Sequence, residues 1–164
     1  MTTFDASDYY IPKPYSVTQA DMAFLPGIVN AELKGRDFPL DEETIIDVIK
    51  SNVYYSVVLL KDNAVHGWAV FHAVDEDLYV DRLSFANGDD VETALEELFK
   101  TITWTVLGSE SKVPEVTLVW PEHSVDNFLF KGLLATGWKA IGLVKDRFPA
   151  YGSLWDGIEV WKKF

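Results

Sequence analysis

Residues 77–107 read DLYVDRLSFANGDDVETALEELFKTITWTVL and determine the fold we expect. Within them, residues 78–85 alternate as the two faces of a strand do, and the link 86–90 reads as a turn. The following residues predict an amphipathic helix over 91–107, because apolar side chains recur at helical spacing: Val91, Leu95, Leu98, Ile102 and Val106. Many α/β proteins bind a ligand at such a turn, since the free amides and the positive dipole end of the helix face it.

The link at the start of this helix carries negative charge. Asp89, Asp90 and Glu92 stand there, and no basic residue is close to them in the sequence. Asp89 or Asp90 is a good N-cap, so we expect the helix start to be satisfied without a ligand. The protein's own carboxylates therefore occupy the ligand end of this strand, turn and helix.

Patterns on both sides of this stretch predict one mixed sheet. Before it we expect a strand at 15–17, a helix from Thr18 to Leu33 that is interrupted or bent near Pro26, a helix at 41–50, and a hairpin of strands 54–60 and 64–74. After it we expect a strand at 113–120, a helix at 125–135, a strand at 137–144, a long turn at 149–157 and a strand at 158–161. Along the chain, strands joined by hairpins come first and strands joined by crossover connections come later. This order indicates an α/β (α+β) fold with a mixed, mostly antiparallel sheet and helices on both faces.

The composition is that of one globular domain. At 164 residues, 48% of them hydrophobic, the chain suits a single domain over residues 1–164, with residues 1–14 as an N-terminal arm. The net charge of -12 argues against nucleic acid as a partner. Such a charge indicates either a basic protein partner or simply solubility.

Several kinds of site and location are excluded by what the sequence lacks. Without Cys there is no disulfide, thiolate nucleophile or Cys metal site. The acidic turns lack EF-hand spacing, so we expect no metal. Neither a signal-peptide pattern nor an apolar run of about 18 residues is present. We therefore expect a protein that has no membrane partner and works in the cytoplasm or inside a larger particle.

Three short segments resemble the GNAT superfamily of acyl-CoA-dependent N-acetyltransferases. KDNAVHGWAV at 61–70 is similar to the family's turn and following strand with its leading Gly. ATGW at 135–138 resembles the Gly-aromatic pair after the family's last helix, and DGIEVWK at 156–162 resembles its closing strand. Together with the order of elements, the likeness covers the chain from Tyr15 onward and implies the GNAT fold.

The loop that binds acetyl-CoA in this family is altered here. The family holds the pyrophosphate with a loop of pattern Arg/Gln-x-x-Gly-x-Gly/Ala at the start of its long helix. The family also has a small residue followed by Leu in this helix. Aligning Ala94 and Leu95 with that pair puts Asp90 and Glu92 where the two glycines of the loop should be. Each carboxylate about 5 Å from a pyrophosphate charge would oppose it by roughly 3 kcal/mol at an effective dielectric near 20. The resemblance therefore implies no cofactor, with acetyl-CoA as the alternative, and a degenerate loop made of Asn87, Gly88, Asp89, Asp90 and Glu92.

A second departure concerns the proton donor for the departing thiolate. Many family members use a Tyr in the last helix, within the pattern Asn-x-x-Ala-x-x-Leu-Tyr-x-Lys-x-Gly-Phe. Aligned on Gly137, Leu133 stands at that Tyr, and a shift by one residue gives Leu134. Neither side chain can donate a proton.

Two residues beyond a predicted strand are the candidates for catalysis. Glu122 and His123 follow the strand 113–120, at a place that borders the acyl-acceptor cleft in the GNAT fold, so either could act as a general base. The alternative is a helix-starting loop with Ser124 as its N-cap. For partner binding the candidates are aromatic residues, namely Tyr9, Tyr10 and Trp155.

These observations favour a GNAT-fold protein with a degenerate acyl-CoA site, acting as a non-catalytic protein-binding or assembly module. Fold alone does not establish an activity. Some phage particles carry GNAT-like proteins of this degenerate kind, and the resemblance extends to such a virion-associated role. The alternative is a divergent acetyl-CoA-dependent N-acyltransferase that holds CoA through other contacts.

Overall fold

A computed structural model describes residues 14–75, 77–107, 115–150 and 152–164. In these ranges a seven-stranded sheet runs in the order β1-β2-β3-β4-β5-β7-β6. Its strands are β1 (Tyr15–Gln19), β2 (Tyr55–Lys61), β3 (Ala64–Val74), β4 (Asp77–Phe85), β5 (Glu115–Pro121), β6 (Lys139–Ala150) and β7 (Ser153–Lys163). The helices are α1 (Leu25–Gly35), α2 (Glu42–Lys50), α3 (Val91–Leu107) and α4 (Phe128–Ala135), with short 3-10 helices η2 (Met22–Phe24) and η3 (Glu122–Ser124).

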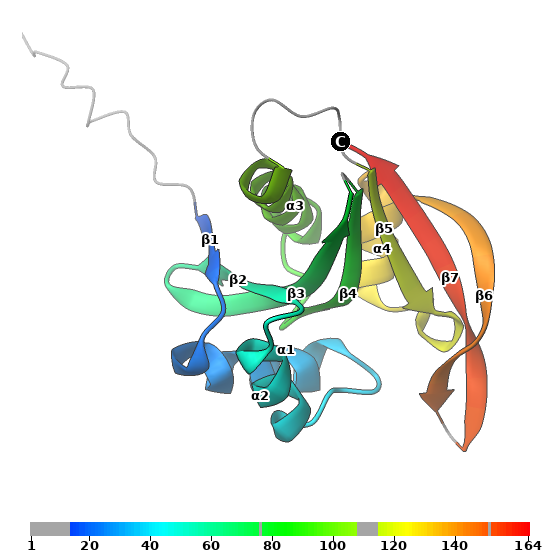
Figure 1. Cartoon of the computed structure of the whole chain (residues 1–164), viewed down its shortest axis with the longest axis horizontal. Coiled ribbons are helices and arrows are strands. Elements are labelled where there is room, and N and C mark those ends of the chain that lie inside the picture. The colour runs from blue at the N-terminus through cyan, green and yellow to red at the C-terminus, as the bar shows by residue number, and fades with distance from the viewer. Residues whose placement is uncertain (1–13, 76, 108–114, 151) are drawn as a thin grey trace, which may run out of the picture.

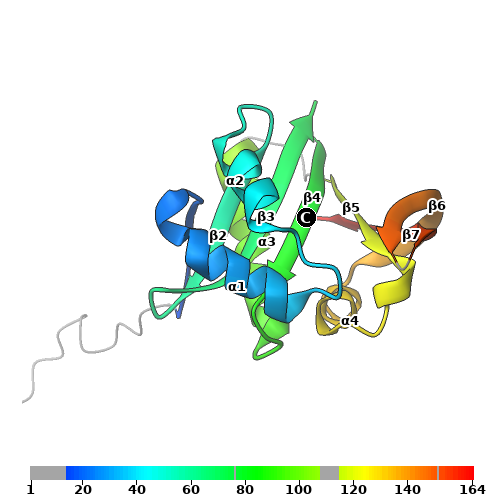
Figure 2. The same cartoon turned by 90° about the horizontal axis from the view of Figure 1, so that it is seen from below.

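Helices cover both faces of the sheet (Figures 1 and 2). On one face α3 and α4 pack over a core that includes Leu83, Leu98 and Leu133. On the other face α1 and α2 pack over a core that includes Ile28 and Trp68. Neighbouring strands are antiparallel except β4 and β5, which pair parallel. The predicted α/β (α+β) class, with a mixed, mostly antiparallel sheet, is therefore confirmed.

The first predicted helix starts later than expected. Thr18 belongs to β1, and the strand ends where Asp21 caps η2 by accepting a hydrogen bond from the Ala23 amide (2.9 Å). The helix α1 then begins at Leu25. Pro26 falls in its first turn, where a missing amide costs no hydrogen bond, so it starts the helix instead of bending it.

A hairpin replaces the long turn predicted at 149–157. β6 and β7 stay paired almost to their tips, with Pro149 opposite Leu154, and the register is interrupted between Val144 and Phe148. β6 is the last strand of the sheet order. The turn prediction was wrong because an edge strand tolerates Pro, since its outward amides have no ladder partner to lose.

Two features of β4 create the geometry of the site. Val70 of β3 pairs with Arg82 and Phe71 with Val80, which leaves Asp81 as the extra residue of a bulge. A bulge turns two successive side chains toward one side of a strand. In the described residues β4 pairs with β5 over 78–80 and 116–118, and the two strands then diverge (Figure 1).

Candidate functional site

The turn before α3 is held by the protein's own groups. Ala94 donates its amide to the Asp90 carbonyl (3.0 Å), so Asp90 directly precedes α3, whose first residue is Val91. Asp90 has a φ of 54°, in the left-handed region that Asp tolerates better than most residues, and its carboxylate accepts the Tyr15 hydroxyl (3.1 Å). Burial, then the hydrogen bond and charge of Asp90, raise the pKa of Tyr15 to about 12. Asp90 therefore stands at the predicted N-cap position, but its carboxylate is bonded to Tyr15, and no hydrogen bond to it from an amide of the first turn of α3 is found among the described residues.

Two basic side chains lie near this acidic turn, although the sequence order does not show it. The Lys61 ammonium is 5.6 Å from the ring centroid of Tyr15. His66 is 5% exposed, with its ring centroid 6.0 Å from that of Tyr15 and 5.3 Å from that of Phe85. Burial and then the charge of Lys61 lower the pKa of His66. Lys61 therefore offsets part of the negative charge at the start of α3.

The start of α4 presses against the same turn. A Cβ on Gly88 would meet Phe128 at 3.1 Å, so this aromatic ring packs directly on the loop. Asn127 caps α4 by accepting the Leu129 amide (2.8 Å). Ser124 instead lies in η3 and donates its hydroxyl to Asp37 (2.6 Å), so the prediction of Ser124 as the N-cap was wrong. Asn127 is the better cap because it directly precedes the helix.

Arg36 fills the gap where β4 and β5 diverge. Its Nη1 donates to the Leu83 carbonyl of β4 (2.6 Å), and its guanidinium carbon lies 4.2 Å from the ring centroid of Trp120 on β5. Burial, with the nearby charge of Arg82 adding to it, lowers the pKa of Arg36 to about 9, so Arg36 stays protonated at neutral pH. A cavity of only about 20 Å³ is left between these residues, which is room for little more than a water molecule.

The segment that carries Arg36 is fixed to the sheet on both sides. Asn127 donates its amide group to the Gly35 carbonyl (2.8 Å). A Cβ on Gly35 would lie 1.9 Å from the Phe85 carbonyl oxygen, so the end of α1 touches the end of β4 backbone to backbone. The Arg36 side chain is therefore held in the gap by contacts from α1, β4 and the start of α4.

A buried network under the bulge holds Arg82. Glu32 of α1 is 0% exposed and accepts hydrogen bonds from the Leu40 amide (2.8 Å), the Trp68 indole (2.9 Å), Arg82 (2.5 Å) and the Ser84 hydroxyl. Burial opposes ionisation of Glu32, but the bonds and charge of Arg82 outweigh it and lower the pKa of Glu32. Arg82 is thus tied to α1 as well as to its own strand.

A hollow of about 400 Å³ opens on the α1 and α2 face, in front of the filled gap. His123 lines it, with its ring centroid 4.9 Å from that of Phe38 and 5.6 Å from that of Trp155. Burial lowers the pKa of His123, and the charge of Arg36 adds to this effect. Trp155 is half-buried against His123, and its role as a partner-binding residue stays a prediction. Glu122 is exposed at the start of η3 and is not part of the wall.

An imidazole and carboxylate pair at this hollow was missed by the sequence analysis. His72 Nδ1 lies 2.6 Å from Asp81 Oδ2, and Asp81 lines the hollow. The His72 ring stacks on Tyr79 (5.4 Å) and meets the edge of Tyr54 (6.2 Å). A carboxylate on one ring nitrogen leaves the other as a base, which is the arrangement of a general base. Only the β3–β4 register, with its bulge, could have revealed the pair.

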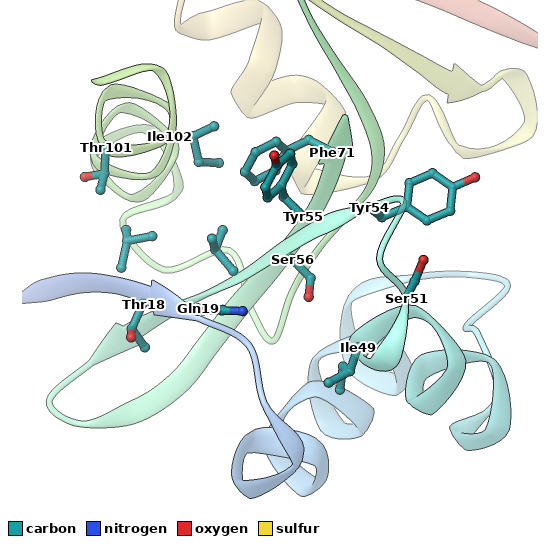
Figure 3. A pocket seen from close by; sticks show the side chains of 12 residues that line it. Thr18, Gln19, Ile49, Ser51, Tyr54, Tyr55, Ser56, Phe71, Thr101 and Ile102 are labelled. Carbon is teal, nitrogen blue, oxygen red and sulfur yellow. The ribbon is translucent and has the colours of Figure 1, made fainter. Parts of the chain in front are cut away.

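A second hollow, of about 440 Å³, lies at the β1 edge of the sheet (Figure 3). Tyr55 stacks on Phe71 there at 5.8 Å, and Ile102 of α3 faces them, while Thr101 also lines the hollow. Among the described residues, its lining includes no carboxylate, amine, guanidinium or imidazole. It offers apolar contact, whereas the acid–base groups gather at the first hollow.

The remaining predicted residues add no catalytic group to either hollow. Leu133, at the position of the family's Tyr, is fully buried, and Leu134 is 44% exposed. Tyr9 and Tyr10 lie outside the described residues. Within the described ranges no cluster of three or more His, Cys, Asp or Glu side chains could hold a metal ion. No helix of the described chain is both long enough and apolar enough to cross a bilayer.

Solved structures with this architecture include acetyltransferases. The ribosomal-protein-S18-alanine N-acetyltransferase from Escherichia coli has 13% sequence identity and a TM-score of 0.66, over 91% of this chain and 93% of that one. A spermidine N-acetyltransferase from Vibrio cholerae, in complex with CoA and spermine, has 11% identity and a TM-score of 0.67, over 92% and 95%. Ard1 from Thermoplasma volcanium has 10% identity and a TM-score of 0.68, over 92% and 98%.

Likeness at such low identity concerns the fold. No protein-family model matches the sequence, and no curated protein matches it either. The chain therefore has the fold of the GNAT acetyltransferases over nine-tenths of its length, as the three sequence segments implied.

Proposed function

We propose that this GNAT-fold protein lacks a working acyl-CoA site and serves as a non-catalytic protein-binding or assembly module. The observation that carries the proposal is the Arg36 side chain between β4 and β5. An acyl-CoA molecule with its pyrophosphate at the β4–α3 turn and its thiol at the opposite face of the sheet would have to pass through the gap between these strands. The gap is filled by Arg36 and Trp120, with about 20 Å³ left over.

Displacing Arg36 would be costly. Its hydrogen bond to Leu83 and its contact with Trp120 would both be lost. A hydrogen bond from a charged group contributes about 1.5–3 kcal/mol, and a cation–π contact about 0.5–2 kcal/mol. Together they would weaken a competing ligand by roughly 30-fold to several thousandfold. Asp90 at the helix start and Phe128 against the loop oppose a pyrophosphate at the other end of the path.

The rest of the molecule suits binding to a protein. Its net charge of -12 favours a basic surface on the partner, since opposite charges steer association. Exposed aromatic side chains, among them Tyr55 (59%) and Trp104 (67%), offer apolar contact at the β1 edge and on α3. A structural part of a larger particle, such as a phage virion, is one form of this role.

The first experiment is a calorimetric titration of acetyl-CoA and of free CoA into the purified protein at low salt. We expect no heat of binding up to millimolar ligand. Binding at micromolar strength would overturn the proposal. For the module itself, a tagged copy expressed in its native source should co-purify with another protein in fixed stoichiometry. A tagged copy that remains a lone monomer would contradict that role.

A divergent N-acyltransferase is the second candidate, and one observation favours it. The His72–Asp81 pair lies beside a 400 Å³ hollow on the face where an acyl acceptor would bind. If acetyl-CoA binds, His72→Gln should abolish turnover of an amine acceptor more completely than Glu122→Gln or His123→Ala. Equal activity in His72→Gln and the wild type would remove the pair from any mechanism.

A further inference from the structure

All three arginines of the chain meet at one hollow. Arg36, Arg82 and Arg147 are far apart in the sequence, yet each lines the hollow of about 400 Å³ on the α1 and α2 face. The chain as a whole has a net charge of -12. This hollow is therefore a concentration of guanidinium groups on an otherwise acidic protein.

The three guanidinium groups are engaged to different degrees. Arg36 donates to the Leu83 carbonyl (2.6 Å), and Arg82 donates through Nε and Nη2 to Glu32 (3.0 and 2.5 Å). Arg147 is exposed and lies 5.3 Å from the ring centroid of Phe148. No carboxylate of the described chain pairs with it. Arg147 is therefore available to a ligand, with the other two arginines behind it.

The carboxylates around the hollow are already bonded to protein groups. Asp81 is bonded to His72 (2.6 Å), Glu32 is buried beneath Arg82, and Asp37 accepts the Ser124 hydroxyl (2.6 Å). Among the described lining residues Asp81 is the only carboxylate, against three arginines, whereas the molecule as a whole is strongly negative. An anion thus meets less repulsion here than at the acidic surface.

The rest of the wall is flat and apolar. The rings of Phe38, Tyr54 and Phe148 line it together with Leu40, and its volume lies in the range of about 300–1,000 Å³ that small-molecule sites occupy. We propose that the hollow binds a small molecule with an oxyanion, a carboxylate or a phosphate, on a flat apolar body. The oxyanion pairs with Arg147 in the bidentate geometry that guanidinium favours, and the body lies against Phe38 and Phe148. This site does not rest on the proposed function, because it needs no acyl-CoA and no partner.

Arginine side-chain NMR signals provide a specific test. Because every arginine lines the hollow, all arginine Nε–H signals report on it. Benzoate and phenyl phosphate are the probes, and they distinguish a carboxylate from a phosphate; benzylammonium and benzyl alcohol are the cationic and neutral controls. At low salt, where screening is weak, at least one anion should shift the Arg147 signal saturably, and the two controls should not.

Two variants complete the test. Arg147→Gln should weaken the anion about tenfold or more, since a charged hydrogen-bonding group is lost. Lys139→Gln makes the same charge change at an exposed site on the same strand and should alter the affinity by no more than about twofold. In the Arg147→Gln variant without ligand, Arg36 and Arg82 Nε–H signals at their wild-type positions show that the hollow is intact. No saturable shift with either anion, equal shifts with benzylammonium, or equal weakening in both variants would overturn the proposal.

Discussion

The substitution Glu32→Gln removes one charge from the centre of a buried network and leaves the side chain almost the same size. Glu32 is 0% exposed and accepts hydrogen bonds from Leu40, Trp68 and Arg82. Gln keeps one acceptor oxygen but directs an amide donor at groups that are themselves donors. It also leaves the Arg82 cation, whose side chain is 15% exposed, without its counter-ion.

The cost follows from this unpaired charge. Removing one partner of a buried ion pair costs about 3–5 kcal/mol. For a chain of this size each kcal/mol lowers Tm by roughly 2–4 °C, so we expect a fall of about 6–20 °C. The measurement is thermal and urea unfolding followed by circular dichroism. The control is Glu96→Gln, the same change at an exposed site on α3, which should cost less than about 0.5 kcal/mol. A Glu32→Gln midpoint within about 2 °C of this control would refute the reasoning.

The pH dependence of unfolding provides a second readout. Burial opposes ionisation, but the bonds and charge of Arg82 prevail, so the pKa of Glu32 lies below its usual 4.5 in the folded protein. A carboxyl with a lowered folded pKa contributes stability above its unfolded pKa and loses it as the pH falls through the folded pKa. The difference between wild type and Glu32→Gln should therefore shrink as the pH falls below 4.5. A difference that does not vary with pH would show that Glu32 is not ionised.

Three further predictions concern other parts of the structure. Gly35→Ala should destabilise the protein by about 2 kcal/mol or more in urea unfolding, because the new Cβ would lie 1.9 Å from the Phe85 carbonyl oxygen. The control is Gly142→Ala, whose Cβ would have no atom within 4 Å and which should cost less than about 1 kcal/mol. Tyr15→Phe should remove a tyrosine that ionises at about 12 in an ultraviolet titration. Because the folded pKa of Tyr15 is raised from 10.0, wild-type stability should fall as the pH rises from 10.0 to about 12, and the variant should lack this decline. A double-mutant cycle of His72→Gln and Asp81→Asn should give a coupling below about 1 kcal/mol, since the pair is exposed; a larger value would mean that the pair supports the fold.

Most elements could be predicted because their signals are local. The helix over 91–107 has its apolar stripe and acidic start, and the hairpin at 55–74 has a turn at Asp62 and Asn63, which both adopt positive φ. The failures were also local. Asp21 follows β1 and caps η2, and Pro149 sits on an edge strand, so each was assigned to the wrong element.

The contacts that define the site could not be predicted, because they join residues far apart in sequence. Arg36 reaches Leu83 and Trp120 from the end of another helix, and nothing around residue 36 indicates that gap. The bulge at Asp81 shifts the alternation of β4 by one residue, so the face reached by Arg82 depends on pairing with β3. His123 could be placed near the end of β5, but its position in the hollow wall, apart from Glu122, required the fold.

The Arg36 side chain in the gap has a consequence for ligand-linked stability. A protein with an empty crevice gains stability from the ligand that fills it, by RT ln(1 + [L]/Kd), so its Tm rises and falls with ligand concentration. Here the occupant is covalently part of the chain, and its effective concentration in the gap never changes. It bridges two strands that pair over three residues each, 78–80 and 116–118. Under the proposed function, the shape and lifetime of the protein are therefore decoupled from the acyl-CoA supply of the cell, which suits a part that must keep one form within an assembly.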